Sequence, residues 1–106
     1  CVTNKPIRFT TPLLCYLGLD GFFPVVLGGD SLAQKKPDPA PLRVAAKRLG
    51  LPLDACLMVG DSATDVSAAR NAGIGVIAVS YGYSRGVEAA ELGADAVVDS
   101  LLELLA

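Results

Sequence analysis

Short apolar runs recur along the chain, and segments with apolar residues at helical spacing lie between them. The runs fall at residues 2–3, 25–28, 56–59, 74–79 and 96–98. Runs of this length without polar alternation are typical of strands buried on both faces of a parallel sheet. Strands that alternate with helices over short loops indicate an α/β fold. We therefore expect a three-layer parallel sheet with helices on both faces.

Five segments between and after these strands are predicted to be helical. They span residues 4–17, 38–49, 62–72, 87–92 and 100–105. Asn4 is the expected cap of the first helix, and Pro12 inside that helix should kink or divide it. Ser62, with Asp65 three positions later, resembles a capping box in which Asp replaces the usual Glu. The third helix should therefore begin immediately after Ser62.

Right-handed crossovers place every strand-to-helix loop of such a sheet on one edge. Ligands of parallel α/β sheets bind at that edge, beyond the carboxyl ends of the strands. The loops that meet there are residues 3–4, 28–37, 60–61 and 80–81. Polar side chains in these four loops are therefore the candidates for a functional site.

Two carboxylates follow the strand at residues 56–59. Asp61 stands directly after Gly60, and Asp65 lies in the first turn of the next helix. Two acids at a strand end could hold a hard cation such as Mg²⁺, which prefers oxygen ligands. The alternative is that both are helix-end acids that favour the helix dipole. That explanation suffices for Asp65, but nothing structural requires a charge at Asp61.

Other polar groups on the same edge suit a phosphate. Thr3 and Asn4 follow a strand and open a helix, so their hydroxyl and backbone N–H groups could bind phosphoryl oxygens, although an ordinary helix cap would look the same. Lys36 precedes a stiff turn at residues 37–39 and could neutralise a phosphoryl group, or could be a solvated surface lysine. Together with Asp61 and Asp65 these groups suit phosphoryl transfer, which depends on positioning and charge neutralisation. The chain offers no obvious nucleophile with an activating base.

Composition narrows the remaining possibilities. The chain has 106 residues, enough for one modest domain, with 52% hydrophobic and 19% charged residues, which excludes a disordered chain. A net charge of −2 without a charge run argues against nucleic-acid binding, and no apolar run is long enough to cross a membrane. The absence of histidine excludes a Ser-His-Asp triad and a His-ligated zinc site. Three cysteines without metal-like spacing are expected to be thiols in a reducing cytoplasm.

Three ordered motifs resemble the haloacid dehalogenase-like phosphatases. Residues 2–5 (Val-Thr-Asn-Lys), 36–37 (Lys-Pro) and 60–65 (Gly-Asp-Ser-Ala-Thr-Asp) resemble the second, third and fourth motifs of that family. The resemblance covers the whole chain. Within the family, the sequence looks most like the bacterial phosphoglycolate phosphatases. The resemblance thus implies a phosphatase that hydrolyses a small phosphomonoester, preferably 2-phosphoglycolate, through an aspartyl-phosphate.

The resemblance also implies a role for each candidate residue. Thr3 and the backbone of Asn4 would hold phosphoryl oxygens of the substrate. Lys36 would bind the same group and act in catalysis by steadying the nucleophile and the transferring phosphoryl. Asp61 would ligate Mg²⁺ directly, and Asp65 would be a further ligand or would orient a metal-bound water.

The chain departs from the family in what precedes Thr3. In the family, the attacking aspartate and an acid-base aspartate two residues later lie on an upstream strand, followed by a cap domain. Residues 1–106 therefore look like a single partial domain, the carboxyl-terminal half of a core that lacks the nucleophile strand and the cap. The missing strand would lie between residues 2–3 and 56–59, and its absence would leave open sheet edges that invite self-association. We expect the isolated chain to be inactive.

Two alternatives to the phosphoglycolate reading stay open. Because selectivity in the family resides largely in the cap, a related sugar-phosphate or amino-sugar-phosphate phosphatase stays open beside the preferred phosphoglycolate phosphatase. From another class, a non-catalytic receiver-like or scaffold module could use the same strand-end carboxylates. The order Thr3, Lys36, Asp61 and Asp65 fits a receiver poorly, because a receiver needs an acidic pair at its first strand.

Overall fold

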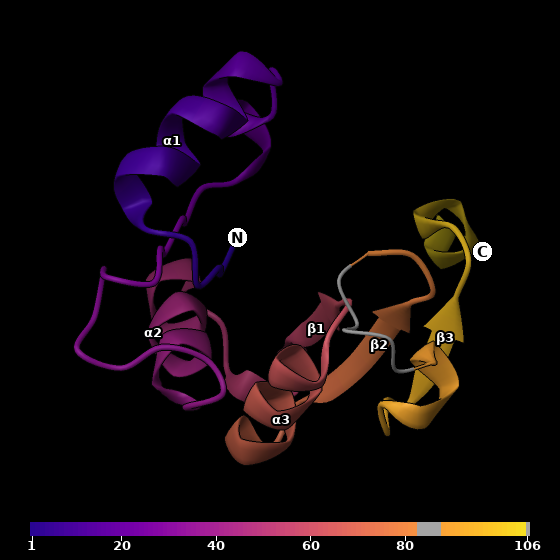
Figure 1. The fold of residues 1–106 in the computed structure, drawn as a ribbon. Helices are drawn as coiled ribbons and strands as arrows, with labels where there is room; N and C mark the ends of the chain where they lie inside the picture. Colours follow the sequence, from indigo (N-terminus) through magenta and orange to yellow (C-terminus); the bar gives the residue numbers. More distant parts are fainter. Residues whose placement is uncertain (83–87, 106) are drawn as a thin grey trace.

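A computed structural model describes residues 1–82 and 88–105 of the chain. Its sheet has three parallel strands in the order β1-β2-β3, formed by β1 (Leu57–Gly60), β2 (Gly75–Val79) and β3 (Ala96–Val98) (Figure 1). Met58 pairs with Val76, and Ile77 pairs with Ala96. These strands lie within one residue of the predicted positions, so the α/β class with a parallel sheet is confirmed.

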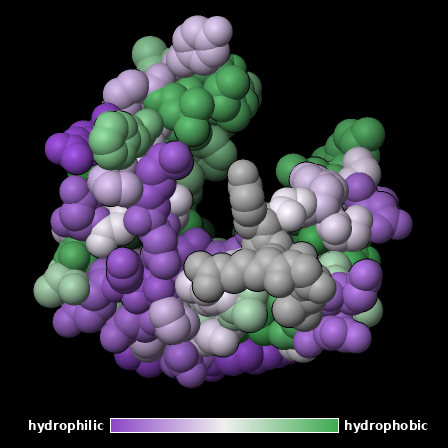
Figure 2. Space-filling model, viewed as in Figure 1, coloured by the Kyte–Doolittle hydropathy of each residue, from purple (hydrophilic) through white to green (hydrophobic). Residues whose placement is uncertain are grey.

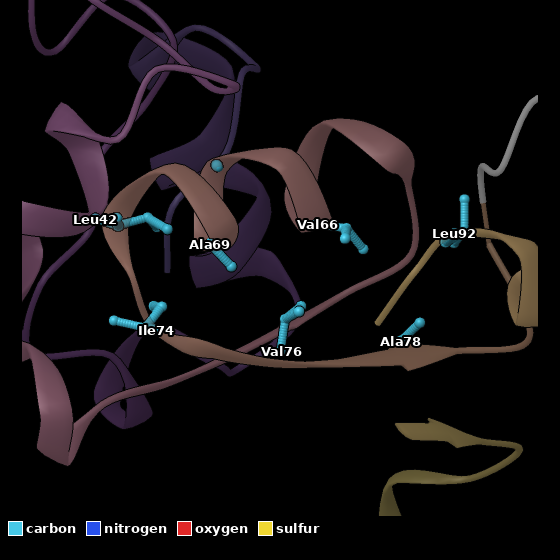
Figure 3. Packing of buried hydrophobic residues seen from close by; sticks show 9 residues of the cluster. Leu42, Val66, Ala69, Ile74, Val76, Ala78 and Leu92 are labelled. Atoms are coloured by element: carbon cyan, nitrogen blue, oxygen red, sulfur yellow. The ribbon is translucent and has the colours of Figure 1, made fainter. Parts of the chain in front are cut away.

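Helix α3 (Ala63–Ala72) covers one face of the sheet by packing against β1 and β2. Figure 3 shows Val66 and Ala69 of α3 directed toward Val76 and Ala78 of β2. Small alanine side chains let the helix approach the strands closely, and Val76 and Ala78 are completely buried. The cluster around them comprises Leu42, Val66, Ala68, Ala69, Ala72, Ile74, Val76, Ala78 and Leu92.

The opposite face of β1 is more open. Because successive side chains of a strand point to opposite faces, Leu57 and Val59 share the side that α3 does not cover. They are 56% and 37% exposed. The prediction of helices on both faces is thus met on the face that α3 covers. On the other face, the described residues leave Leu57 and Val59 of β1 partly uncovered.

Helix α2 (Ala40–Leu49) packs against α3, and α1 (Ile7–Tyr16) stands apart from the strands (Figure 1). Of the two outcomes predicted for Pro12, a kink or a division of the first helix, division is wrong, since α1 runs unbroken through Pro12. Arg8 and Pro12 are both exposed, so water can hydrate the carbonyl that proline leaves without a helical donor. Hydrophobic surface gathers over α1, where Phe9 and Leu13 are exposed (Figure 2).

Several predicted short elements differ in type. Residues 25–28 form one parallel bridge, between Val2 and Leu27, in place of a full strand. The helix expected at 100–105 is the 3₁₀ helix η4 (Leu101–Leu105), and Ser100 caps it by accepting a hydrogen bond from the N–H of Leu102 at 3.2 Å. Segments this short gain too few helical bonds to offset nucleation, which favours 3₁₀ turns.

The predicted helix at 87–92 is represented by the 3₁₀ turn η3 (Ala89–Glu91), while Val87 lies outside the described residues, as do Tyr83 and Ser84 of the loop expected after β2. Further 3₁₀ turns are η1 (Asp20–Phe22) and η2 (Leu53–Ala55). Across the described parts of the chain, every helix is too short or too polar to span a bilayer. The three cysteines are free thiols.

Candidate active site

A buried ion pair joins the loop before α2 to the first turn of α3. The Lys36 ammonium nitrogen Nζ lies 2.6 Å from Oδ1 of Asp65, and the same nitrogen donates to the Val2 carbonyl at 2.8 Å. Lys36 is 8% exposed and Asp65 is 6% exposed. The Lys36–Pro37 peptide bond is cis. Its two hydrogen bonds and its burial make Lys36 a fixed, buried cation at the strand-end edge, so its interpretation as a solvated surface lysine is wrong.

The other oxygen of Asp65 is also engaged. Oδ2 accepts from the backbone N–H of Asp61 at 3.0 Å, from that of Ser62 at 3.3 Å and from the Ser62 hydroxyl at 3.1 Å. Ser62 Oγ accepts in turn from the Asp65 N–H, which completes the predicted capping box. Burial alone would raise the pKa of Asp65, but the hydrogen bond and positive charge of Lys36, with these further donors, hold that pKa below its usual value.

Gly60 makes this arrangement sterically possible. A Cβ atom on Gly60 would lie 2.4 Å from Asp65 Oδ2 and 2.5 Å from Asp65 Cβ. No side chain fits at that distance, so the end of β1 must be glycine if Asp65 is to fold back over it. Because residue 60 is glycine, the Asp65 carboxylate can pack against the end of β1 while it also takes part in the capping box of α3.

Asp61 lies beside this pair on the wall of a cavity. The cavity has a volume of about 500 Å³ and is lined by the following residues: Val2, Lys36, Met58, Val59, Gly60, Asp61, Asp65, Val79, Tyr81, Gly82 and Leu101. Asp61 is half-buried. The fold therefore brings Lys36, Asp61 and Asp65 together, from three different segments, around one space.

Thr3 and Asn4 lie near Lys36, Asp61 and Asp65, and their side chains make different hydrogen bonds. Thr3 Oγ1 accepts a hydrogen bond from the Lys5 N–H at 3.1 Å. Asn4 Nδ2 donates to the backbone carbonyl of Lys36 at 2.9 Å, so the Asn4 side chain anchors the lysine loop. The predicted role of Asn4 as the side-chain cap of the first helix is therefore wrong. Val2 lines the cavity, whereas Thr3 and Asn4 do not.

Asp30 was missed by reasoning from the sequence. Its Oδ1 accepts from the Ile7 N–H at 2.8 Å, so an acid distant in sequence occupies the N-terminus of α1. Gly29 packs so closely beneath this turn that a Cβ there would lie 2.1 Å from the Asn4 carbonyl oxygen. The sequence signal for such a distant cap is Pro6, which precedes the helix and has no side chain that could cap it.

Mg²⁺ fits this oxygen-donor set as a partial site. Within residues 1–82 and 88–105, no group of three or more acidic, cysteine or histidine residues could enclose a metal. Mg²⁺ usually keeps several waters and binds through one or two carboxylates together with substrate phosphates, which Asp61 on the cavity wall can satisfy. Asp65 could ligate directly only by exchanging one of its present donors.

Comparison with known proteins assigns the chain to a class. The family model described as haloacid dehalogenase-like hydrolase matches residues 1–79. The chain therefore belongs to the haloacid dehalogenase-like hydrolase family.

Particular relatives narrow the resemblance. The phosphoglycolate phosphatase of Nitrosococcus oceani is 48% identical over 104 residues, which cover 98% of this chain and 46% of the relative. A predicted phosphoglycolate phosphatase from Haemophilus somnus has a crystal structure that matches with a TM-score of 0.93 at 38% identity, covering 98% of this chain and 46% of that one. CbbY from Rhodobacter sphaeroides, in complex with phosphate, matches with a TM-score of 0.69 at 36% identity over 81% of this chain and 37% of that one.

The chain thus spans about half the length of the relatives that it matches. The shared half contains the three motifs at residues 2–5, 36–37 and 60–65, and confirms the predicted family resemblance and the α/β core.

Proposed function

We propose that the complete protein carrying this chain is a Mg²⁺-dependent phosphatase that hydrolyses a small phosphomonoester. The observation that carries this proposal is the Lys36–Asp65 pair, held in a cavity that Asp61 also lines. A buried ammonium and a neighbouring carboxylate supply what phosphoryl transfer needs, namely charge neutralisation and a cation ligand at fixed positions.

Lys36 is arranged to bind a phosphoryl oxygen. An ammonium group has three donors, and Lys36 directs two of them to Asp65 and Val2. The remaining N–H can donate to a phosphoryl oxygen in the cavity. Because Asp65 and Val2 hold the nitrogen, little side-chain freedom is lost when the substrate binds.

Thr3 and Asp61 complete the proposed binding set. Thr3 does not line the cavity itself but directly follows Val2, which does. Its hydroxyl oxygen accepts from the Lys5 N–H, which leaves the hydroxyl hydrogen able to donate to a phosphoryl oxygen bound there. Asp61 would hold Mg²⁺, with Asp65 as a further ligand or as the group that orients a metal-bound water. When bound there, the cation would neutralise charge on the phosphoryl oxygens.

The nucleophile is proposed to come from a further strand. Val2, Met58 and Val59 line both the site cavity and a second cavity of about 450 Å³, and Val2 pairs with Leu27, so a gap that both cavities border lies between Val2 and β1. We propose that an added strand fills this gap and presents the attacking aspartate and an acid-base aspartate to the phosphoryl group. Residues 1–106 alone should then be inactive.

The proposed substrate is 2-phosphoglycolate, hydrolysed to glycolate, in the cytoplasm. The names of the Nitrosococcus oceani and Haemophilus somnus relatives support this choice. Sugar-phosphate and amino-sugar-phosphate substrates are the alternatives within the same chemistry.

The test is phosphate release by the complete natural protein. We expect the highest kcat/KM for 2-phosphoglycolate among phosphoglycolate, a sugar phosphate and an amino-sugar phosphate, with activity lost to a chelator and restored by Mg²⁺. Residues 1–106 alone, assayed in parallel, should release no phosphate above background. Mg²⁺ binding without turnover of any of the three esters would contradict the proposal and favour a non-catalytic receiver-like module.

A further inference from the structure

The backbone of Gly82 lies directly against the side chain of Asp61. A Cβ atom on Gly82 would stand 2.3 Å from Asp61 Oδ2, 2.8 Å from Asp61 Cβ and 3.0 Å from Asp61 Cγ. Gly82 also has φ +117°, a conformation that residues with side chains rarely adopt. The loop that follows β2 can therefore reach the Asp61 carboxylate only because residue 82 is glycine.

We propose that Gly82 is a positioning residue for the Asp61 carboxylate. Its backbone closes one side of that carboxylate, while both residues line the same cavity. Because Oδ2 is the Asp61 atom nearest to the Cβ position of residue 82, the carboxylate already faces this backbone, and contact with it presets the orientation of the carboxylate toward a bound cation. This inference rests on the proposed function only in taking Asp61 as the cation ligand.

The contact cannot be relieved by rotating the carboxylate alone. Oδ2 is the mobile end of the Asp61 side chain, but Asp61 Cβ is fixed to the backbone at the end of β1. A methyl group on residue 82 must therefore displace either the loop or the whole Asp61 side chain. Either displacement changes where the carboxylate stands in the cavity.

Other glycines with a positive φ distinguish this contact from general backbone strain. Gly50, Gly73 and Gly93 also have positive φ, and for each a Cβ would meet nothing within 4 Å. Gly93, at φ +80° in the segment before β3, is the best matched control because it lies outside the helix C-caps formed by the other two. Gly93→Ala introduces positive-φ strain without a contact to the site.

The experiment compares Mn²⁺ binding by Gly82→Ala, Gly93→Ala and the unsubstituted complete protein, followed by electron paramagnetic resonance without substrate. We expect Gly82→Ala to weaken Mn²⁺ affinity about 10- to 100-fold, the range seen when a group that orients a metal ligand is removed. Gly93→Ala should bind Mn²⁺ as the unsubstituted protein does. Unchanged affinity in Gly82→Ala, or an equal loss in Gly93→Ala, would overturn the inference.

A second measurement needs no substitution at residue 82. In the unsubstituted protein, Mn²⁺ should broaden the amide resonance of Gly82 well before that of Gly93, because Gly82 adjoins the ligand. Equal broadening of the two resonances would overturn the inference while leaving phosphatase activity intact. Failure of the unsubstituted protein to bind Mn²⁺ would instead overturn the proposed function, and this inference with it.

Discussion

The ammonium of Lys36 and the carboxylate of Asp65 lie 2.6 Å apart, although 29 positions separate them in the sequence. Taking two charges out of water is unfavourable unless further hydrogen bonds satisfy them. Here Val2 accepts a second hydrogen from Lys36, and donors from Asp61 and Ser62 serve the other oxygen of Asp65. Both oxygens of the Asp65 carboxylate therefore accept hydrogen bonds, and the burial of each charge depends on the presence of the other.

Removal of one partner should be strongly destabilising. We expect Lys36→Met and Asp65→Asn each to lower the free energy of unfolding by about 3–5 kcal/mol, because each leaves an uncompensated charge or an unsatisfied polar group in a buried position. Urea unfolding of the variants measures this change. The double variant should lose less than the sum of the two single losses.

Lys35→Met is the matched control for the lysine substitution. Lys35 is the exposed neighbour of Lys36, so its loss should change the free energy of unfolding by no more than about 0.5 kcal/mol. Equal effects at positions 35 and 36 would show that the buried pair contributes no specific stability.

Stability should fall in acid through Asp65. Lys36 and the other donors hold the pKa of Asp65 below the usual value in the folded chain, whereas an unfolded aspartate has a pKa of about 3.9. The unfolded state then binds the proton more readily, so the contribution is fully present above about pH 4 and disappears as the pH falls through the lower, folded pKa. Unfolding free energies measured between about pH 6 and pH 3 should decline less steeply for Asp65→Asn than for the unsubstituted protein. Parallel declines would contradict this assignment.

Gly60→Ala should disrupt the junction of β1 and α3. The added methyl group would collide with both Oδ2 and Cβ of Asp65, and we expect a loss of about 1–3 kcal/mol, as for overpacked positions. Gly21→Ala is the control, since a Cβ there meets nothing within 4 Å and neither glycine requires a positive φ. Thermal unfolding that ranks the two variants equally would contradict the proposed steric role.

Asp61→Asn should separate chemistry from stability. The substitution keeps the size of the side chain but removes the charge that would hold Mg²⁺, so phosphatase activity of the complete protein should be abolished. Asp20→Asn, an exposed change in η1, should leave the rate unchanged. Steady-state assays across a range of Mg²⁺ concentrations test this. An unaltered rate in Asp61→Asn would remove Asp61 from the metal assignment.

Local chemistry made much of this fold predictable from the sequence. Ser62 with Asp65 marked the start of α3, and Gly50 and Gly73 ended α2 and α3 with φ of +72° and +76°. Apolar runs located the three strands because parallel strands are buried on both faces. Signals of this kind act over a few residues, so they can be recognised without knowledge of the tertiary structure.

Contacts between distant segments were the part that the sequence could not supply. Asn4 had the properties of a helix cap, yet its side chain holds the Lys36 loop and Asp30 caps the helix instead. Lys36 by itself had the properties of a solvated surface lysine, whereas the structure places it beside a carboxylate 29 positions away in the sequence. No role could be predicted for Gly82, because its closeness to Asp61 depends on how the loop after β2 folds.

The position of β1 at the end of the described sheet has a practical consequence for anyone who handles this chain by itself. Leu57 and Val59 of that strand are exposed apolar residues, and an edge strand of this kind can act as a template for another strand. We propose that separate copies of the chain pair with each other along this strand edge. Protein concentration would then decide which species is present, and dilution would be the first variable to control in any preparation.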